Sequence, residues 1–241
     1  MSTSADITQL GTIMGIWAHP DDETFSMAGI MAAAVQNGQQ VICITATRGE
    51  AGVQDESRWP AHQLASIRTH ELEEALQTLG VKTHVFLDYS DGGCADVDAN
   101  DAIERIATLI KKYQPNSIFT FGPDGLTGHP DHKTVSAWAI AAAKQANKKP
   151  AVYFALQTTA QYNAMTKVDK HLNVFFNIDK PPIKDDCECD VCFCLDHDQM
   201  QLKQKALAAM PSQTELMLGR FSDCLPDIIG TEAFALYTEQ V

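Results

Sequence analysis

The stretch TIMGIWAHPDDE at residues 12–23 carries the pattern that decides the fold. Its apolar run, Ile13–Trp17, is followed at once by a histidine, a proline and three acidic residues. A short apolar run of this kind predicts a buried strand. Proline costs no hydrogen bond at the first helical position, and acidic residues suit the positive end of a helix dipole. The stretch therefore predicts a strand that leads directly into a helix.

The same alternation of short apolar runs and amphipathic segments continues along the chain. We expect strands at Ile13–Trp17, Val41–Thr45, Thr83–Leu87, Ser117–Phe121 and Ala151–Leu156. We expect helices at Glu23–Asn37, Ala61–Leu79, Asp101–Tyr113 and Pro130–Ala146. Strands that alternate with helices form a parallel sheet covered on both faces. The predicted fold class is α/β: a doubly wound, mostly parallel, Rossmann-like sheet in a three-layer sandwich.

The last quarter of the chain departs from this alternation and predicts an appendage to the sheet. Asn173–Ile183 is expected to be a loop or edge element, Cys187–Leu195 a strand and Asp198–Met210 a helix. We find no repeat, low-complexity tract or change of composition that would mark a linker. Residues 1–241 are therefore predicted to form a single domain.

Composition and charge exclude several classes of protein. Hydrophobic residues make up 45% and charged residues 20%, which is ordinary globular usage. A formal net charge of −13 repels polyanions, so nucleic acid is not an expected partner. The first residues lack a basic signal-like region, and no apolar window is long enough for a membrane span, so we expect a cytoplasmic protein. The 7 cysteines, an odd number, do not suggest a disulfide framework.

Polar residues follow four of the predicted strands, at the edge where open parallel sheets bind ligands. These positions are residues 18–23, residues 47–50, Asp88, and residues 122–132. The first contains His-Pro-Asp-Asp and the last His-Pro-Asp-His. Either motif alone could be a helix cap beside a surface histidine. Their joint occurrence at two strand ends favours a shared site.

These two motifs supply the ligand set of an open metal site. Residues three apart on the first turn of a helix point to one side, so His19 can converge with Asp22, and His129 with His132. A catalytic zinc takes three nitrogen or oxygen ligands and leaves one position for water. We predict that His19, Asp22 and His132 hold the metal, which leaves Asp21 and His129 for acid–base work.

Together with Thr-Arg-Gly-Glu at residues 47–50 and the pair Arg68 and Glu71, these motifs resemble the LmbE/PIG-L family of zinc N-deacetylases. The resemblance covers about residues 12–145 in register. It implies the same three metal ligands, Asp21 as general base and His129 facing the developing oxyanion. It further implies substrate contacts for Arg48, with Asp88 as an acidic residue near the pocket.

Arg68 and Glu71 are equally explained by an ordinary ion pair three residues apart on a helix. The sequence also departs from the family near its C-terminus. Relatives there carry His-x-Ser-Gln, whereas Met210–Gln213 keeps Ser-Gln and lacks the histidine.

The function implied by the resemblance is removal of an acetyl group from an N-acetylglucosamine-type small molecule by zinc-activated water. Fe²⁺ suits the same ligands. Alternatives are hydrolysis of another acetamide or of a thiol-conjugate amide, or a non-catalytic metal-containing binding protein. Relatives are commonly oligomers, so a homo-oligomer is also an expectation.

A second group of metal-ligand residue types is the cysteine cluster Cys187, Cys189, Cys192 and Cys194. Four thiolates could bind a structural zinc, but the Cys-x-Cys pairs lack the usual two-residue spacer. Alternation of cysteine and apolar residues instead favours one face of a strand, with metal binding or redox sensitivity as the alternative.

Overall fold

The computed structural model describes residues 5–175 and 177–239. Its strands are β1 (Ile13–Trp17), β2 (Val41–Thr47), β3 (Thr83–Tyr89), β4 (Ser117–Phe121), β5 (Ala151–Thr158), β6 (Ile183–Lys184), β7 (Val191–Cys194) and β8 (Thr231–Leu236). Its α-helices are α1 (Asp22–Gln36), α2 (Ala61–Thr78), α3 (Ala99–Tyr113), α4 (Pro130–Lys144), α5 (Thr159–Leu172), α6 (His197–Ala208), α7 (Pro211–Arg220) and α8 (Leu225–Ile229).

The strands form one mostly parallel sheet in the order β3-β2-β1-β4-β5-β8-β7, with the short β6 beside β5. Strands β1 to β6 pair in parallel, whereas β8 runs antiparallel to β5 and β7 antiparallel to β8. The order reverses between β1 and β4, because β1 leads outward to β2 and β4 leads outward to β5. Such a switch point is where open α/β sheets bind ligands.

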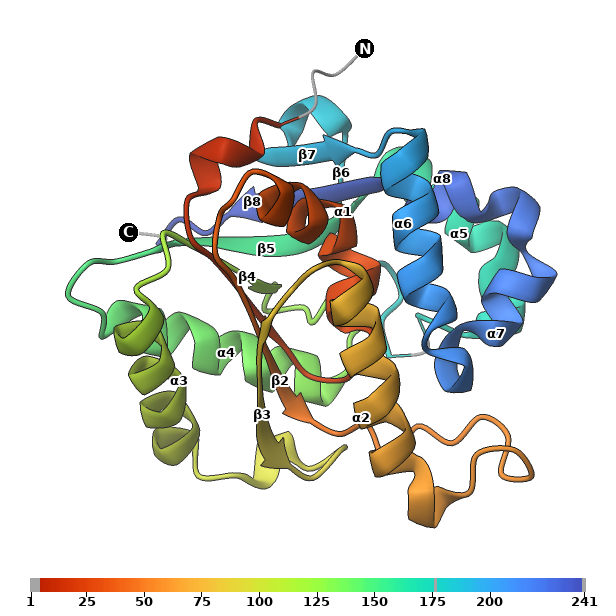
Figure 1. Cartoon of the computed structure of the whole chain (residues 1–241), viewed down its shortest axis with the longest axis horizontal. Helices are drawn as coiled ribbons and strands as arrows, with labels where there is room; N and C mark the ends of the chain where they lie inside the picture. The colour runs from red at the N-terminus through yellow and green to blue at the C-terminus, as the bar shows by residue number, and fades with distance from the viewer. Residues whose placement is uncertain (1–4, 176, 240–241) are drawn as a thin grey trace.

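Helices cover both faces of the sheet and give three layers (Figure 1). Helices α3 and α4 pack against each other on one face, while α1, α2 and α6 cover the other. The central strands β1, β2 and β4 are buried along their whole length, which explains why they read as continuous apolar runs. The predicted fold class is confirmed.

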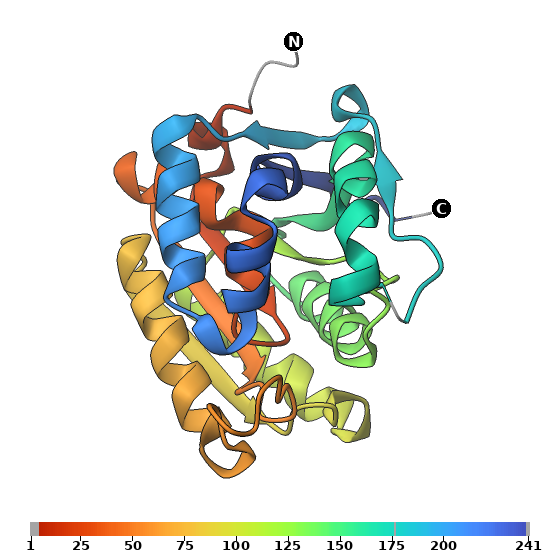
Figure 2. The same ribbon diagram turned by 90° about the vertical axis from the view of Figure 1, so that its right-hand side faces the viewer.

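The C-terminal part is more elaborate than the sequence predicts. Figure 2 shows α5, α6 and α7 across one side of the molecule, and α5 and α7 were not predicted. The strand expected over Cys187–Leu195 is wrong in its first half. Only residues 191–194 pair with β8, because a 3-10 turn at Asp186–Glu188, closed by the capping box of Asp185 and Glu188, precedes it. None of the helices described is long and apolar enough to cross a membrane.

Helix α1 is interrupted at Met27, and two residues distant in the sequence form hydrogen bonds with the backbone groups that the interruption leaves unpaired. Met27 has non-helical dihedral angles, with φ −148° and ψ 24°. The carboxylate of Glu232 accepts hydrogen bonds from the backbone N–H groups of Gly29 and Ile30, both at 2.8 Å. The ammonium of Lys203 donates to the carbonyl of Phe25 at 2.7 Å and to Glu232 at 2.8 Å. This fully buried ion pair fixes the turn that begins with Asp22.

Candidate metal centre

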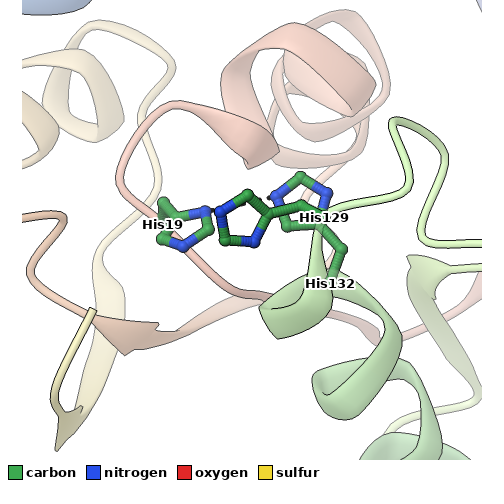
Figure 3. A group of neighbouring side chains, drawn as sticks. All are labelled: His19, His129 and His132. Atoms are coloured by element: carbon green, nitrogen blue, oxygen red, sulfur yellow. Dashed lines mark hydrogen bonds between the residues drawn. The ribbon is translucent and has the colours of Figure 1, made fainter. Parts of the chain in front are cut away.

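The switch point brings the two histidine motifs together. His19 follows β1, the side chain of His129 caps the N-terminus of α4, and His132 lies in the first turn of α4. Figure 3 shows the three rings close together, His19 from the segment after β1 and the other two from the start of α4. One ring nitrogen from each of the three histidines lies within 4.8 Å of the other two. Because β1 lies beside β4 in the sheet, His19 and His132 meet although they are 113 positions apart in the sequence.

The donor atoms of His19, Asp22 and His132 converge, with Asp22 using one carboxylate oxygen toward each histidine. Nδ1 of His19 lies 3.2 Å from Nε2 of His132, which lies 3.4 Å from Oδ1 of Asp22. Oδ2 of Asp22 lies 3.6 Å from Nδ1 of His19. Ligands about 2.1 Å from a tetrahedral metal are about 3.4 Å apart. The residues present therefore fit the metal that the family implies.

His132 is oriented by contacts on the side of its ring that faces away from these donors. Its Nδ1 lies 2.9 Å from the carbonyl oxygen of Gly125, so Nδ1 carries the proton and Nε2 offers a lone pair. The ring stacks on Phe121 with centroids 3.9 Å apart. Burial lowers the pKa of His132 to about 4 despite the nearby Asp22 carboxylate. A neutral imidazole is the form that binds metal.

His19 is oriented by two carboxylates that the sequence analysis did not single out. Its Nε2 lies 3.0 Å from Asp91 and 3.3 Å from Asp131, opposite the nitrogen that faces His132. Burial would lower the pKa of His19, but bonds to Asp131, Asp22 and Asp91 raise it well above its usual range. Asp131 also accepts hydrogen bonds from the backbone N–H groups of Gly92 and Cys94. We therefore assign Asp91 and Asp131 to holding His19 rather than to a second metal.

Asp22 is ionised and tied to its neighbours. Its Oδ2 accepts a 2.7 Å hydrogen bond from the backbone N–H of His19. Burial would raise its pKa, but electrostatic attraction to the ring of His132 and the hydrogen bonds of His19 hold the pKa well below the usual range.

Asp21 has an unusual backbone and a perturbed carboxyl group. Its φ of 121° lies in a region that residues other than glycine rarely adopt, and its N–H donates to Glu23 at 3.3 Å. Its Oδ2 lies 3.3 Å from Nη2 of the buried Arg68. Burial raises the pKa of Asp21 to about 7, although the charge of Arg68 opposes the shift. Strain of this kind at a pocket is typical of residues held in place for chemistry.

His129 keeps one ring nitrogen available. Its Nδ1 accepts a 3.2 Å hydrogen bond from the backbone N–H of Asp131, so the proton resides on Nε2. Burial and the charge of His19 lower the pKa of His129. The Nε2–H of the ring is therefore available as a hydrogen-bond donor.

Arg68 and Glu71 turn to different partners rather than forming the ion pair considered from sequence. Arg68 donates to the carbonyl oxygens of Gly49 and Pro20 at 2.8 and 2.5 Å. Glu71 accepts from the backbone N–H and the hydroxyl of Ser212 at the start of α7. A Cβ on Gly49 would lie 2.3 Å from the Arg68 guanidinium. The glycine of Thr-Arg-Gly-Glu thus makes room for Arg68.

A polar cavity of about 300 Å³ lies over these groups. Its lining includes Asp21, Arg68, Asp91, His129 and Gln213. Gln213 belongs to the Ser-Gln pair that the sequence retains and is held by a 3.0 Å hydrogen bond to the carbonyl of Gly52.

Arg48 and Asp88 do not line this cavity. They form an ion pair with each other at 2.8 Å, with side chains 37% and 59% exposed. Arg48 also donates to Thr69 at 2.7 Å and lies over the ring of Phe86.

The fold and the site define a Rossmann-like α/β protein with a His/Asp metal centre at the sheet switch point. Residues 14–143 match the family model described as PIG-L, GlcNAc-PI de-N-acetylase. The chain belongs to the PIG-L family.

Its relatives include a 1D-myo-inositol 2-acetamido-2-deoxy-alpha-D-glucopyranoside deacetylase of Mycobacterium leprae, 33% identical over 141 residues. The match covers 50% of this chain and 46% of that protein, so the chain spans about half the length of the curated relatives it matches.

Solved structures share the fold over nearly the whole chain. The N,N'-diacetylchitobiose deacetylase of Pyrococcus horikoshii aligns with a TM-score of 0.67 and 24% identity, covering 96% of this chain and 87% of that one. The 4-carboxy-2-hydroxymuconate hydratase of Pseudomonas putida aligns with a TM-score of 0.60 and 16% identity, covering 96% and 98%. Because a deacetylase and a hydratase share it, the fold alone does not define the reaction.

Proposed function

We propose that this protein is a zinc-dependent N-deacetylase of an N-acetylglucosamine-type small molecule, with the metal held by His19, Asp22 and His132. The observation that carries the proposal is the convergence of their donor atoms beside Asp21 and His129, with contacts of 3.2, 3.4 and 3.6 Å in which both oxygens of Asp22 take part. Membership of the PIG-L family and the deacetylase names of its relatives support the substrate class.

When bound, zinc would supply Lewis acidity for the amide carbonyl and acidify a water molecule. The carboxylate of Asp21 takes the proton of the attacking water and returns it to the nitrogen of the departing amine. The Nε2–H of His129 donates a hydrogen bond to the carbonyl oxygen as negative charge develops on it. Acetate and a free amino sugar are the products. Fe²⁺ suits the same donors, so the metal itself needs direct analysis.

Arg48 and Asp88 enter the proposal as contacts to the distal part of the substrate. Arg48 directly follows β2, and Asp88 lies near the end of β3. Both are at the same sheet edge as the cavity, but neither lines it. Their exposed ion pair offers both a donor and an acceptor to sugar hydroxyls.

Metal analysis of single variants tests the ligand set. His19→Ala, Asp22→Ala and His132→Ala should each lose the metal, because two ligands hold zinc poorly. His70→Ala is the matched control, since this histidine is 72% exposed on α2. Full metal content in a folded ligand variant would remove that residue from the set.

Turnover separates the acid–base groups from the ligands. Asp21→Asn should keep zinc and lose about 100- to 10,000-fold in acetate release. His129→Ala should keep zinc and lose about 100- to 1,000-fold in kcat with KM little changed. If His129→Ala lost zinc and His132→Ala kept it, the two roles would be exchanged.

A substrate panel tests the alternatives. Release of acetate from N-acetylglucosamine derivatives but not from other acetamides or thiol-conjugate amides is expected. No turnover of any amide by zinc-loaded protein would favour a binding protein instead. The presence of a base and an oxyanion donor beside the ligands argues against that alternative.

A further inference from the structure

A second cavity, distinct in chemistry from the polar one, adjoins the same metal ligands. Its volume is about 260 Å³, and Asp22 and His132 belong to the walls of both cavities. The other walls of the second cavity are mostly apolar and include Phe25, Phe121 and Leu126. The metal ligands thus separate a polar space, which contains the acid–base groups, from an apolar one.

Two polar side chains of the apolar cavity are engaged with the protein, whereas Oε1 of Gln157 is buried there without a hydrogen-bond partner in the described part of the chain. Glu232 is bound to Lys203 and to the backbone of α1. The side-chain amide of Gln161 donates to the carbonyl oxygens of Ile228 and Thr231. Apart from this one acceptor, the walls offer mainly apolar surface, which suits a hydrocarbon group.

An amide at the metal places one substituent on each side of its carbonyl carbon. The polar cavity, with Arg68 and Gln213, suits the hydroxyl-rich amine, so the acyl substituent is left for the apolar cavity. An acetyl group would place only one methyl group in the apolar cavity. A methyl group is of similar size to a water molecule, whose share of liquid volume is about 30 Å³, so acetyl would leave most of this space unfilled.

We infer that the apolar cavity is an acyl-chain site and that the protein hydrolyses N-acyl amino sugars with chains longer than acetyl. This inference rests on the proposed function and deepens it. Each methylene buried contributes about 0.8 kcal/mol, which corresponds to about a fourfold change. We expect kcat/KM to rise about fourfold per added methylene from N-acetyl to N-butanoyl and N-hexanoyl glucosamine.

Variants that fill the cavity should reverse this preference. Two residues of the cavity wall offer suitable substitutions: the buried Ala155 of β5 and the half-buried Met165 of α5. The larger side chains of Ala155→Leu and Met165→Trp would fill part of the cavity. Each should lower the hexanoyl-to-acetyl ratio of kcat/KM by about 16-fold, equivalent to roughly two methylenes. Met200→Trp, a half-buried methionine outside the cavity wall, is the matched control and should leave the ratio unchanged. Met165→Trp keeps the test valid if Ala155→Leu does not fold.

Binding of carboxylate products separates this inference from the proposed function. Acetate, butanoate and hexanoate are titrated into the zinc-loaded protein by calorimetry, and affinity should rise with chain length in the parent but not in Met165→Trp. If no amide is cleaved but this trend holds, the proposed function fails and the acyl site stands. Equal affinities for the three carboxylates, or a hexanoyl-to-acetyl ratio below one in the parent enzyme, would overturn the acyl site.

Discussion

The replacement Asp131→Asn isolates the contribution of a carboxylate that contacts His19, one of the proposed metal ligands, from the side opposite the other proposed ligands. Oδ2 of Asp131 faces Nε2 of His19 at 3.3 Å and the N–H of Gly92 at 2.7 Å, while Oδ1 accepts from Cys94 at 3.1 Å. Asparagine can keep its one oxygen at the Oδ2 position. Its NH₂ group then faces the N–H of Cys94, which loses its acceptor.

Two effects of different size follow. The unsatisfied, buried Cys94 N–H should cost about 1–3 kcal/mol of folding stability. Loss of the charge behind His19 should weaken zinc binding about 10- to 100-fold, or about 1.4–2.7 kcal/mol. Competition with a chelator of known affinity measures the second effect, and thermal unfolding of the metal-free protein measures the first.

Asp91 contacts the same nitrogen of His19 at 3.0 Å and could compensate for the loss. The double variant Asp91→Asn/Asp131→Asn should therefore lose more zinc affinity than the two single effects added together. Zinc affinity of the double variant within about threefold of the parent, well below the usual loss for such partners, would refute the orienting role. Loss of stability without loss of affinity would leave Asp131 a purely structural residue.

Three further outcomes are expected. Burial lowers the pKa of His84 to about 4, so folding stability should be complete above pH 6.5 and fall by about 2 kcal/mol as the pH drops from 6.5 to 4; a flat urea-denaturation profile over that range would contradict it. Lys203→Met leaves the Glu232 carboxylate buried without its cation and should cost about 3 kcal/mol in urea denaturation; a loss below about 1 kcal/mol, well under the cost of breaking such a pair, would contradict the role of the ion pair. Cys192→Ser with Cys194→Ser should leave the metal-to-protein ratio unchanged; loss of one equivalent would establish a thiolate metal site.

The parallel core could be predicted from sequence because each of its elements is encoded locally. A strand buried on both faces is a continuous apolar run, and Pro130 marks the first position of α4 as predicted. Pro20 instead precedes Asp21, the N-cap of α1, so the predicted first helical position of this proline is wrong. These marks located five strands and four helices close to their observed bounds. They also placed His19 and His132 at strand ends that the sheet order brings together.

The remaining parts depend on tertiary contacts that leave no local pattern. Helix α5 is capped by Thr158 and Gln161 and packs against β5 and against the five-residue helix α8, whose position only the tertiary structure shows. The sequence analysis selected Asp88, which directly follows the apolar run, as the acidic residue near the pocket and did not select Asp91. Asp88 adopts a positive φ of 58° and turns to Arg48, which leaves Asp91 to reach His19.

The break in α1 has a consequence for synthesis of the chain. The N–H groups freed at Gly29 and Ile30 find their acceptor only in Glu232, 203 and 202 residues further on. A ribosome releases the N-terminal motif long before β8 exists, so the nascent helix must wait with these groups bound to water or must form without the break. The turn that begins with Asp22 therefore reaches its final position only when β8 joins the sheet. Fragments that end before β8, including one limited to residues 14–143, should lack an ordered turn at Asp22 even if their parallel strands assemble.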